Sequence, residues 1–99
     1  MKINDIYMEL KGRKLCRSGH EFSRSYLGKH SSYLSVLKAR GDDPSIETWA
    51  MLSYALERRA QWLAASDNEF ARDATAYLQK LQRDVADTVR GECASKNAR

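Results

Sequence analysis

The sequence contains few of the residues that interrupt helices. Among 99 residues there is a single proline, Pro44, and there are only five glycines. Residues that favour helices, chiefly alanine, leucine, lysine, arginine and glutamate, are frequent instead. This composition excludes a strand-and-turn architecture and predicts an all-α fold. The chain length and the 42% hydrophobic share fit a single domain with one modest core.

Long apolar runs are also missing. No stretch approaches the roughly 18 apolar residues that a membrane-spanning helix requires, and the first residues lack the apolar core of a signal peptide. Cys16 and Cys93 lie far apart without paired spacing, which argues against a disulfide framework or a metal knuckle. We therefore expect a soluble cytoplasmic protein with no membrane contact. Both thiols should be reduced packing residues, with Cys93 the more exposed of the two.

Patterns typical of catalysis are absent as well. The sequence shows no nucleophile with a nearby base, no carboxylate pair in an apolar setting and no phosphate-binding loop. His20 and His30 are ten residues apart, and neither has a cysteine or carboxylate at ligand spacing. We therefore expect the protein not to be an enzyme and to bind neither a metal ion nor a small-molecule cofactor.

Positive charge is concentrated in the first half of the chain. The net charge is +4 at pH 7, and residues 1–45 alone carry that excess, whereas residues 67–99 hold equal numbers of each sign. Localised positive charge attracts polyanions because binding releases counterions from their phosphates. Charge alone does not identify the partner, but it directs attention to residues 1–45.

Apolar residues recur at spacings of three and four along five segments, which is the period of amphipathic helices. We expect residues 1–65 to form one unit that carries the function, and residues 66–99 to form a C-terminal amphipathic helix used for packing or dimerisation. The predicted helices span about residues 3–15, 19–27, 32–40, 46–65 and 67–90, and the tail from 91 to 99 is expected to fray.

Serines placed before these segments predict where helices begin. Ser18 with Glu21, and Ser66 with Glu69, fit the Ser-x-x-Glu capping box, in which the serine hydroxyl accepts a backbone amide. The other expected caps, and the glycines expected to end helices with positive φ, are Ser31 or Ser32, Ser45, Gly28 and Gly41.

The first half has the skeleton of a helix-turn-helix reader of DNA. Two short helices are separated by a tight turn at Gly28 and are followed by a longer capped helix. One helix must lie across the DNA backbone and hold the next in the major groove, so the second needs a slim, polar outer face. Leu34 and Leu37 define its inner face, which leaves small residues such as Ala39 outside. The candidates for base contacts are Ser31, Ser32, Ser35, Val36 and Lys38.

Residues 21–56 resemble the lambda-repressor-like helix-turn-helix family. The pattern of that family runs helix, glycine turn, polar helix with an inward Ile or Leu followed by Ser, then Gly, Pro-Ser and a helix rich in Leu and Ala. The matching residues are Gly28, Leu34, Ser35, Gly41, Pro44, Ser45 and the closing helix around Leu52 to Leu56. The resemblance covers about a third of the chain. It implies binding in the major groove, usually as a homodimer, and a role in transcriptional control.

The match departs from the family pattern before the turn. Counted back from Gly28 without gaps, Arg24 holds the position where the family prefers a small alanine. Ser23 holds the preceding apolar position, and Lys29 holds the apolar position after the glycine. Either the helix crossing is one residue shorter here, with Ser23 as the small contact, or the motif is degenerate and the two helices pack differently.

The remaining candidate sites follow from charge and from the apolar stripe of the last helix. That helix either folds back onto the first helices or pairs with its copy across a two-fold axis, and we favour a homodimer with double-stranded DNA as the other partner. The candidates for phosphate contacts are Arg17, Arg24, Lys29 and Arg40. The candidates for dimer contacts are Phe70, Tyr77, Leu78, Leu81 and Val85.

A second hypothesis is that the protein binds another protein and not DNA. The misfit at Ser23, Arg24 and Lys29 is also compatible with a non-catalytic protein-interaction module, an adaptor or antitoxin-like partner, whose helix-turn-helix is degenerate. The two hypotheses differ in salt dependence, because phosphate contacts weaken steeply with salt and apolar protein interfaces hardly respond.

Overall fold

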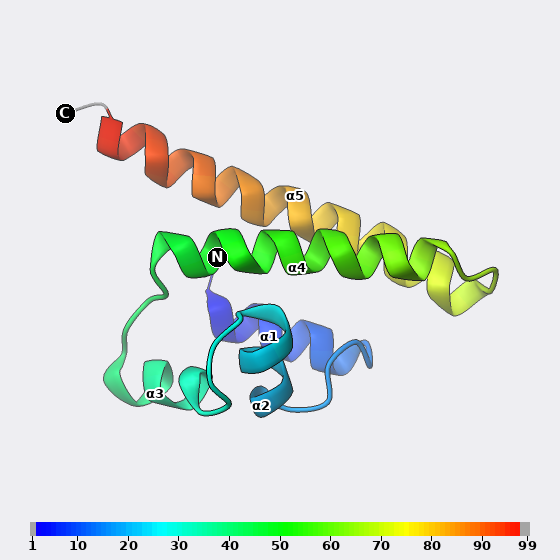
Figure 1. The fold of residues 1–99 in the computed structure, drawn as a ribbon, viewed down its shortest axis with the longest axis horizontal. Helices are drawn as coiled ribbons and strands as arrows, with labels where there is room; N and C mark the ends of the chain where they lie inside the picture. Colours follow the sequence, from blue (N-terminus) through cyan, green and yellow to red (C-terminus); the bar gives the residue numbers. More distant parts are fainter. Residues whose placement is uncertain (1, 98–99) are drawn as a thin grey trace.

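The long helix α4 (Ile46–Ala64) lies between the other elements. The computed structural model describes residues 2–97, with side chains up to residue 93. Helix α5 (Glu69–Asn97) runs along one side of α4 in the opposite direction, and the shorter helices of the first half lie on the other side (Figure 1). The predicted all-α fold is confirmed. None of the helices in residues 2–97 is long and apolar enough to cross a membrane.

The α4 helix holds the core together because it packs against α5 on one side and against the helices of the first half on the other. Trp49, Leu52, Leu56, Ala60 and Leu63 recur at spacings of three and four and are buried, as the amphipathic pattern predicts. The cap at its start is confirmed: the Ser45 hydroxyl accepts a hydrogen bond from the Thr48 amide at 3.3 Å.

The apolar stripe of α5 is used within the chain. Leu78, Leu81 and Val85 are buried in the common core, and the Gln82 side-chain amide donates to the Ser53 hydroxyl of α4 at 3.0 Å. Burial leaves these three apolar residues no surface for a second copy. Their assignment to a dimer contact is therefore wrong, and α5 packs instead within its own chain, chiefly against α4.

The other two residues expected at a dimer contact behave differently. Tyr77 is half-buried against α1 (Ile3–Gly12), where its hydroxyl donates to the Glu9 carboxylate at 3.2 Å and its ring lies 3.7 Å from the Arg13 guanidinium. Tyr77 therefore ties α5 to the first helix. Phe70 remains 53% exposed near the start of α5.

Both ends of α5 differ from the sequence prediction. The helix begins at Glu69, and Asn68 rather than Ser66 caps it, because the Asn68 side-chain oxygen accepts the Ala71 amide at 2.8 Å. At the other end, the helix continues through Gly91 to Asn97, where a frayed tail was expected. A glycine inside a helix costs only about 1 kcal/mol, which the good helix formers around it can offset.

The segment between α1 and the next helix is held by Tyr26. Helix α1 ends at Gly12 rather than near Leu15, and Lys14 adopts a positive φ of 62°. The buried Tyr26 hydroxyl donates to the Leu15 carbonyl at 2.7 Å. Cys16 is buried beside it and Cys93 is exposed, as expected. Burial raises the pKa of the Cys16 thiol above its ordinary value, which favours the neutral packing form.

The Tyr26 hydroxyl makes the stability of the fold sensitive to alkali. Burial raises the pKa of Tyr26 to about 12, from an ordinary value of 10.0. A pKa that is higher in the folded state stabilises the fold below the unfolded value, and this stabilisation is lost as pH rises toward 12. We expect Tyr26→Phe to lower the free energy of unfolding by about 1 kcal/mol at neutral pH. The variant should also lose less stability than the parent in alkali.

Urea unfolding at neutral pH and at several alkaline pH values measures both effects. Tyr54→Phe is the control, because it removes the same hydroxyl from an exposed ring outside the core. Equal alkaline slopes for the parent and Tyr26→Phe would contradict the assignment.

Candidate nucleic-acid interface

The first limb of the candidate interface is a short helix in two parts. Helix α2 (Gly19–Glu21) continues without a break into η1, a π-helical turn (Phe22–Tyr26). The predicted cap is confirmed, because the Ser18 hydroxyl accepts a hydrogen bond from the Glu21 amide at 3.2 Å.

The π turn accommodates one more residue than an α turn. The Leu27 amide donates to the Phe22 carbonyl, five residues back, at 3.1 Å, instead of to the carbonyl four residues back. Arg24 and Ser25 point outward and are exposed, whereas Phe22 and Tyr26 stay buried on either side of them. The wider turn thus presents Arg24 and Ser25 to solvent, while Phe22 and Tyr26 stay in the apolar core.

Ser23 is the small residue between the two limbs. Its side chain is fully buried, and its hydroxyl donates to the Gly19 carbonyl at 2.8 Å and accepts from the Leu34 amide at 3.1 Å. Arg24 takes no part in this contact. Ser23 is therefore a small buried contact between the two limbs, at the start of the π turn. The length of the crossing relative to the resembled family stays a prediction.

The second limb, α3 (Tyr33–Arg40), begins without a cap of its own. Ser32 occupies the cap position, but its side chain makes no capping hydrogen bond and instead lies 2.9 Å from His30 Nδ1. The expectation that Ser31 or Ser32 caps this helix is wrong. The amide of Leu34 is satisfied from the first limb by Ser23, so the start of α3 depends on the neighbouring helix.

Glycines set the ends of both limbs. Gly28 and Gly41 have φ values of +65° and +66°, which confirms the predicted helix ends. A Cβ added at Gly28 would lie 3.2 Å from Met51 Cγ, so the turn between the limbs rests directly on α4. The Tyr33 hydroxyl, 3.4 Å from Thr48 Oγ1, makes a second link from α3 to α4.

The outer face of α3 is made of small side chains. Successive residues are about 100° apart around a helix, so Ser35, Val36 and Ala39 lie opposite the buried Leu34 and Leu37. All three are exposed. Three further residues frame this surface, with Ser31 and Ser32 exposed in the turn before the helix and Lys38 exposed at the margin next to Leu34.

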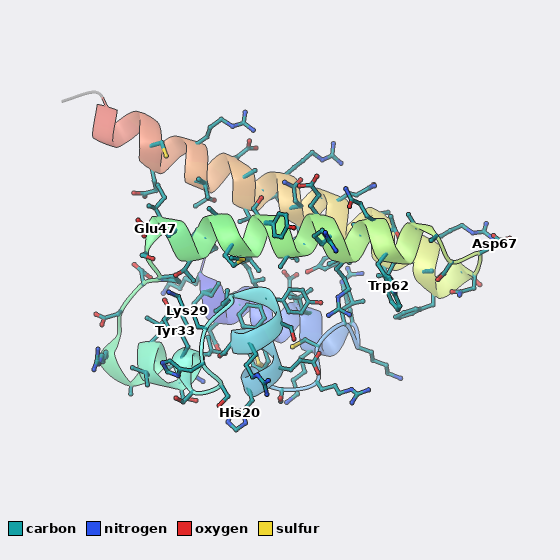
Figure 2. All side chains as sticks on the ribbon, viewed as in Figure 1. His20, Lys29, Tyr33, Glu47, Trp62 and Asp67 are labelled. Atoms are coloured by element: carbon teal, nitrogen blue, oxygen red, sulfur yellow. The ribbon has the colours of Figure 1, made fainter. Side chains whose placement is uncertain are left out.

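The four cations expected to contact phosphates are all exposed. Arg17 precedes α2, Arg24 lies on the π turn, Lys29 follows Gly28 and Arg40 ends α3. Figure 2 shows Lys29 and Tyr33 together, with the Lys29 ammonium 5.7 Å from the Tyr33 ring centroid. Within the part of the chain that the structure describes, none of the four forms an ion pair with a carboxylate.

Metal ligands do not gather at this surface. His20 is exposed on α2 (Figure 2) and His30 lies in the turn. No group of three potential ligands occurs among the described residues. What the surface offers is small hydroxyls and two small apolar side chains, Val36 and Ala39, with the exposed cations Lys29 and Arg40 before and at the end of α3. Hydroxyls and cations of this kind can contact a polyanion.

Comparison with known proteins identifies the family without assigning its role. Residues 3–98 match a group described as "Family of unknown function (DUF6626)". The chain belongs to the DUF6626 family. No curated protein and no solved structure gives a significant match. The function of this DUF6626 protein therefore has to be inferred from its own residues.

The sequence alone suggested Ser23 of the DUF6626 chain as a small contact but missed its hydrogen bond with the Leu34 amide, and this role can be tested by substitution. Ser23→Ala removes the acceptor of the Leu34 amide at a fully buried position. We expect the free energy of unfolding to fall by about 1 to 3 kcal/mol, because a buried donor is left unsatisfied. Chemical unfolding followed by circular dichroism measures the change. The exposed neighbour Ser25→Ala is the matched control, and an equal effect of both substitutions would refute this role.

Proposed function

We propose that this protein is a sequence-specific regulator of transcription that binds double-stranded DNA in the cytoplasm and inserts α3 into the major groove. The observation that carries the proposal is the buried Ser23 contact. It fixes α3 against the first limb by a hydrogen bond to the start of the helix and leaves the outer face of α3 open. A helix held by its neighbour and exposed along one slim face is what major-groove readout requires.

The chemistry of that face supports base contacts. Hydroxyls such as that of Ser35 can donate to or accept from base edges, and a methyl-bearing side chain such as Val36 can contact thymine methyl groups. Ala39, at the centre of the face, adds little bulk and lets the backbone approach the groove floor. Ser31 and Ser32 extend the polar surface before the helix, while Lys38 at the margin is better placed for a phosphate than for a base.

Four exposed cations support the orientation on DNA. Arg17 precedes the first limb and Arg24 lies on it, and Lys29 and Arg40 lie just before and at the end of α3. Cations on both sides of a reading helix can contact phosphates on both walls of the groove, which fixes register without reading sequence. The net positive charge of residues 1–45 supports the same assignment.

The decisive experiment is a fluorescence-anisotropy titration of the protein with a pool of random duplexes at two salt concentrations. We expect saturable binding that weakens by at least about tenfold at the higher salt concentration. The double variant Lys29→Glu/Lys38→Glu should abolish binding, because it places negative charge beside the phosphates. Selection of bound duplexes then gives the preferred site.

The matched control carries the same change of charge on α5. Lys80→Glu/Arg83→Glu alters two exposed cations away from α3 and should leave the affinity within a few-fold of the parent. Loss of binding in both double variants would mean that only the net charge matters. Absence of binding at low salt by the folded protein would contradict the proposal and favour the protein-interaction hypothesis.

A further inference from the structure

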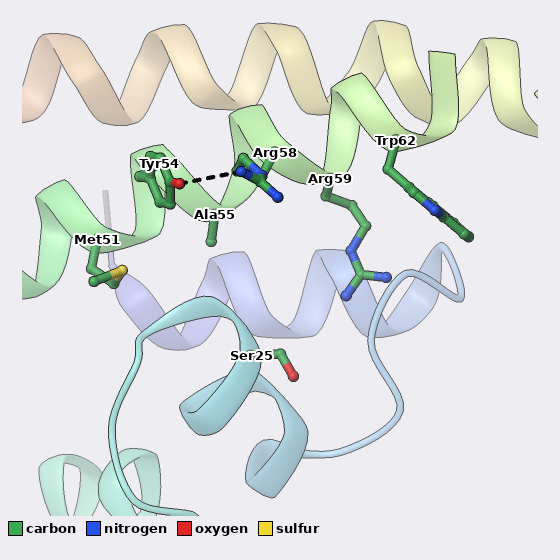
Figure 3. Close-up of a pocket in the computed structure, with 7 residues that line it drawn as sticks. All are labelled: Ser25, Met51, Tyr54, Ala55, Arg58, Arg59 and Trp62. Atoms are coloured by element: carbon green, nitrogen blue, oxygen red, sulfur yellow. Dashed lines mark hydrogen bonds between the residues drawn. The ribbon is translucent and has the colours of Figure 1, made fainter. Parts of the chain in front are cut away.

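The solvent face of α4 carries large apolar side chains that are left exposed by residues 2–93, whose side chains the structure describes. Met51, Tyr54 and Trp62 are 44%, 56% and 67% exposed. Together with Arg58 they follow one line along the helix and border an open groove of about 490 Å³, whose other wall includes Ser25 of the π turn (Figure 3). Contiguous exposed apolar surface of this kind marks a contact with another molecule.

Charge along the same line changes sign from one end to the other. Glu47 lies in the first turn of α4, near the opposite end from Trp62 (Figure 2), and is exposed. Arg58 lies eleven residues later, roughly 16 Å along the helix axis, with its guanidinium 3.5 Å from the Tyr54 hydroxyl. Neither charge forms an ion pair with another described residue. The α4 stripe is defined as Glu47, Met51, Tyr54, Arg58 and Trp62. Its acidic residue is thus separated from its basic residue by Met51 and Tyr54, and Trp62 follows the basic residue.

We propose that the α4 stripe is the interface between two copies of this chain, with the two α4 helices antiparallel across a two-fold axis. If the axis passes between Met51 and Tyr54, Met51 of each copy faces Tyr54 of the other copy. Glu47 of each copy then faces Arg58 of the other copy. A parallel pairing would instead place Glu47 beside Glu47 and Arg58 beside Arg58. Charge therefore selects the antiparallel arrangement.

The shape of the molecule agrees with that symmetry. The chain measures 47 × 30 × 18 Å, and the view down its shortest axis shows α5 on one side of α4 and α3 on the other (Figure 1). The two-fold axis can run perpendicular to α4, from the α5 side of the molecule to the α3 side. Rotation about this axis reverses the direction of α4 and leaves both α3 helices on the same side of the dimer. Two reading helices on one side can engage one duplex. This step alone rests on the proposed function.

Sedimentation equilibrium of the full chain and its charge variants tests the interface. We expect a concentration-dependent dimer for the parent, weakened roughly tenfold or more in Glu47→Arg and in Arg58→Glu. Each of these variants places like charges opposite each other. An equimolar mixture of the two should associate again, as should the double variant, because opposite charges then face each other.

The centre of the stripe is tested with Met51→Asp, which should leave the chain monomeric but helical by circular dichroism. Met8→Asp is the matched control, since Met8 is likewise exposed, at 56%, but lies on α1. Glu69→Arg is the control for Glu47→Arg, because it also places a cation in the first turn of a helix. A parent that stays monomeric at millimolar concentration would overturn the proposal and assign the stripe to another partner. Failure of the mixture to associate, or equal effects of the controls, would overturn it as well.

The outcomes for the two proposals can be told apart. A dimer that responds to the charge variants but binds no duplex leaves the interface standing and removes the DNA-binding function. A monomer that binds duplexes with the expected salt dependence leaves the DNA-binding function standing and removes the interface.

Discussion

The buried hydroxyl of Ser23 is the contact on which the arrangement of the first half depends. It donates to a carbonyl of α2 and accepts from an amide at the start of α3 with one small side chain, at a fully buried position between the limbs. A helix of eight residues such as α3 is too short to be stable alone in water. Its start is therefore fixed by a tertiary hydrogen bond in place of a local cap, and its orientation follows from the same bond.

The π turn explains how that contact coexists with the turn at Gly28. Ser23 opens the π turn with Phe22, and Gly28 follows that turn two residues after Tyr26. A π turn absorbs an added residue by widening one turn, so the elements before and after it keep their relative positions. Arg24 lies on the exposed side of this turn, whereas Phe22 and Tyr26 of the same turn are buried in the core.

The sequence was sufficient for features whose causes are local. The caps at Ser18 and Ser45 and the positive φ values at Gly28 and Gly41 depend on a residue and its immediate neighbours, and all four are found. The capping pattern failed where two polar residues competed, since Asn68 lies nearer than Ser66 to the first helical amides of α5.

Features whose causes are tertiary could not be predicted in this way. An apolar stripe such as Leu78, Leu81 and Val85 shows that a helix face will be buried, but its pattern is the same for a partner in the same chain or in another. Ser23 shows the same limit at the candidate site, because a serine that bonds eleven residues ahead leaves no trace in local spacing.

The apolar stripe of α5 is buried within its own chain, so self-association has to use the exposed α4 stripe. This connects the proposed dimer with the proposed binding of DNA through α3. Met51 packs against the backbone of Gly28 on one side and belongs to the exposed α4 stripe on the other. In the proposed dimer, the turn that sets the angle of α3 would rest on a residue buried between subunits. Two linked reading helices also gain affinity through effective concentration, since binding of the first half-site makes the second encounter intramolecular. By thermodynamic reciprocity, a duplex with two suitably spaced half-sites must strengthen the dimer by the same factor by which dimerisation strengthens binding to DNA.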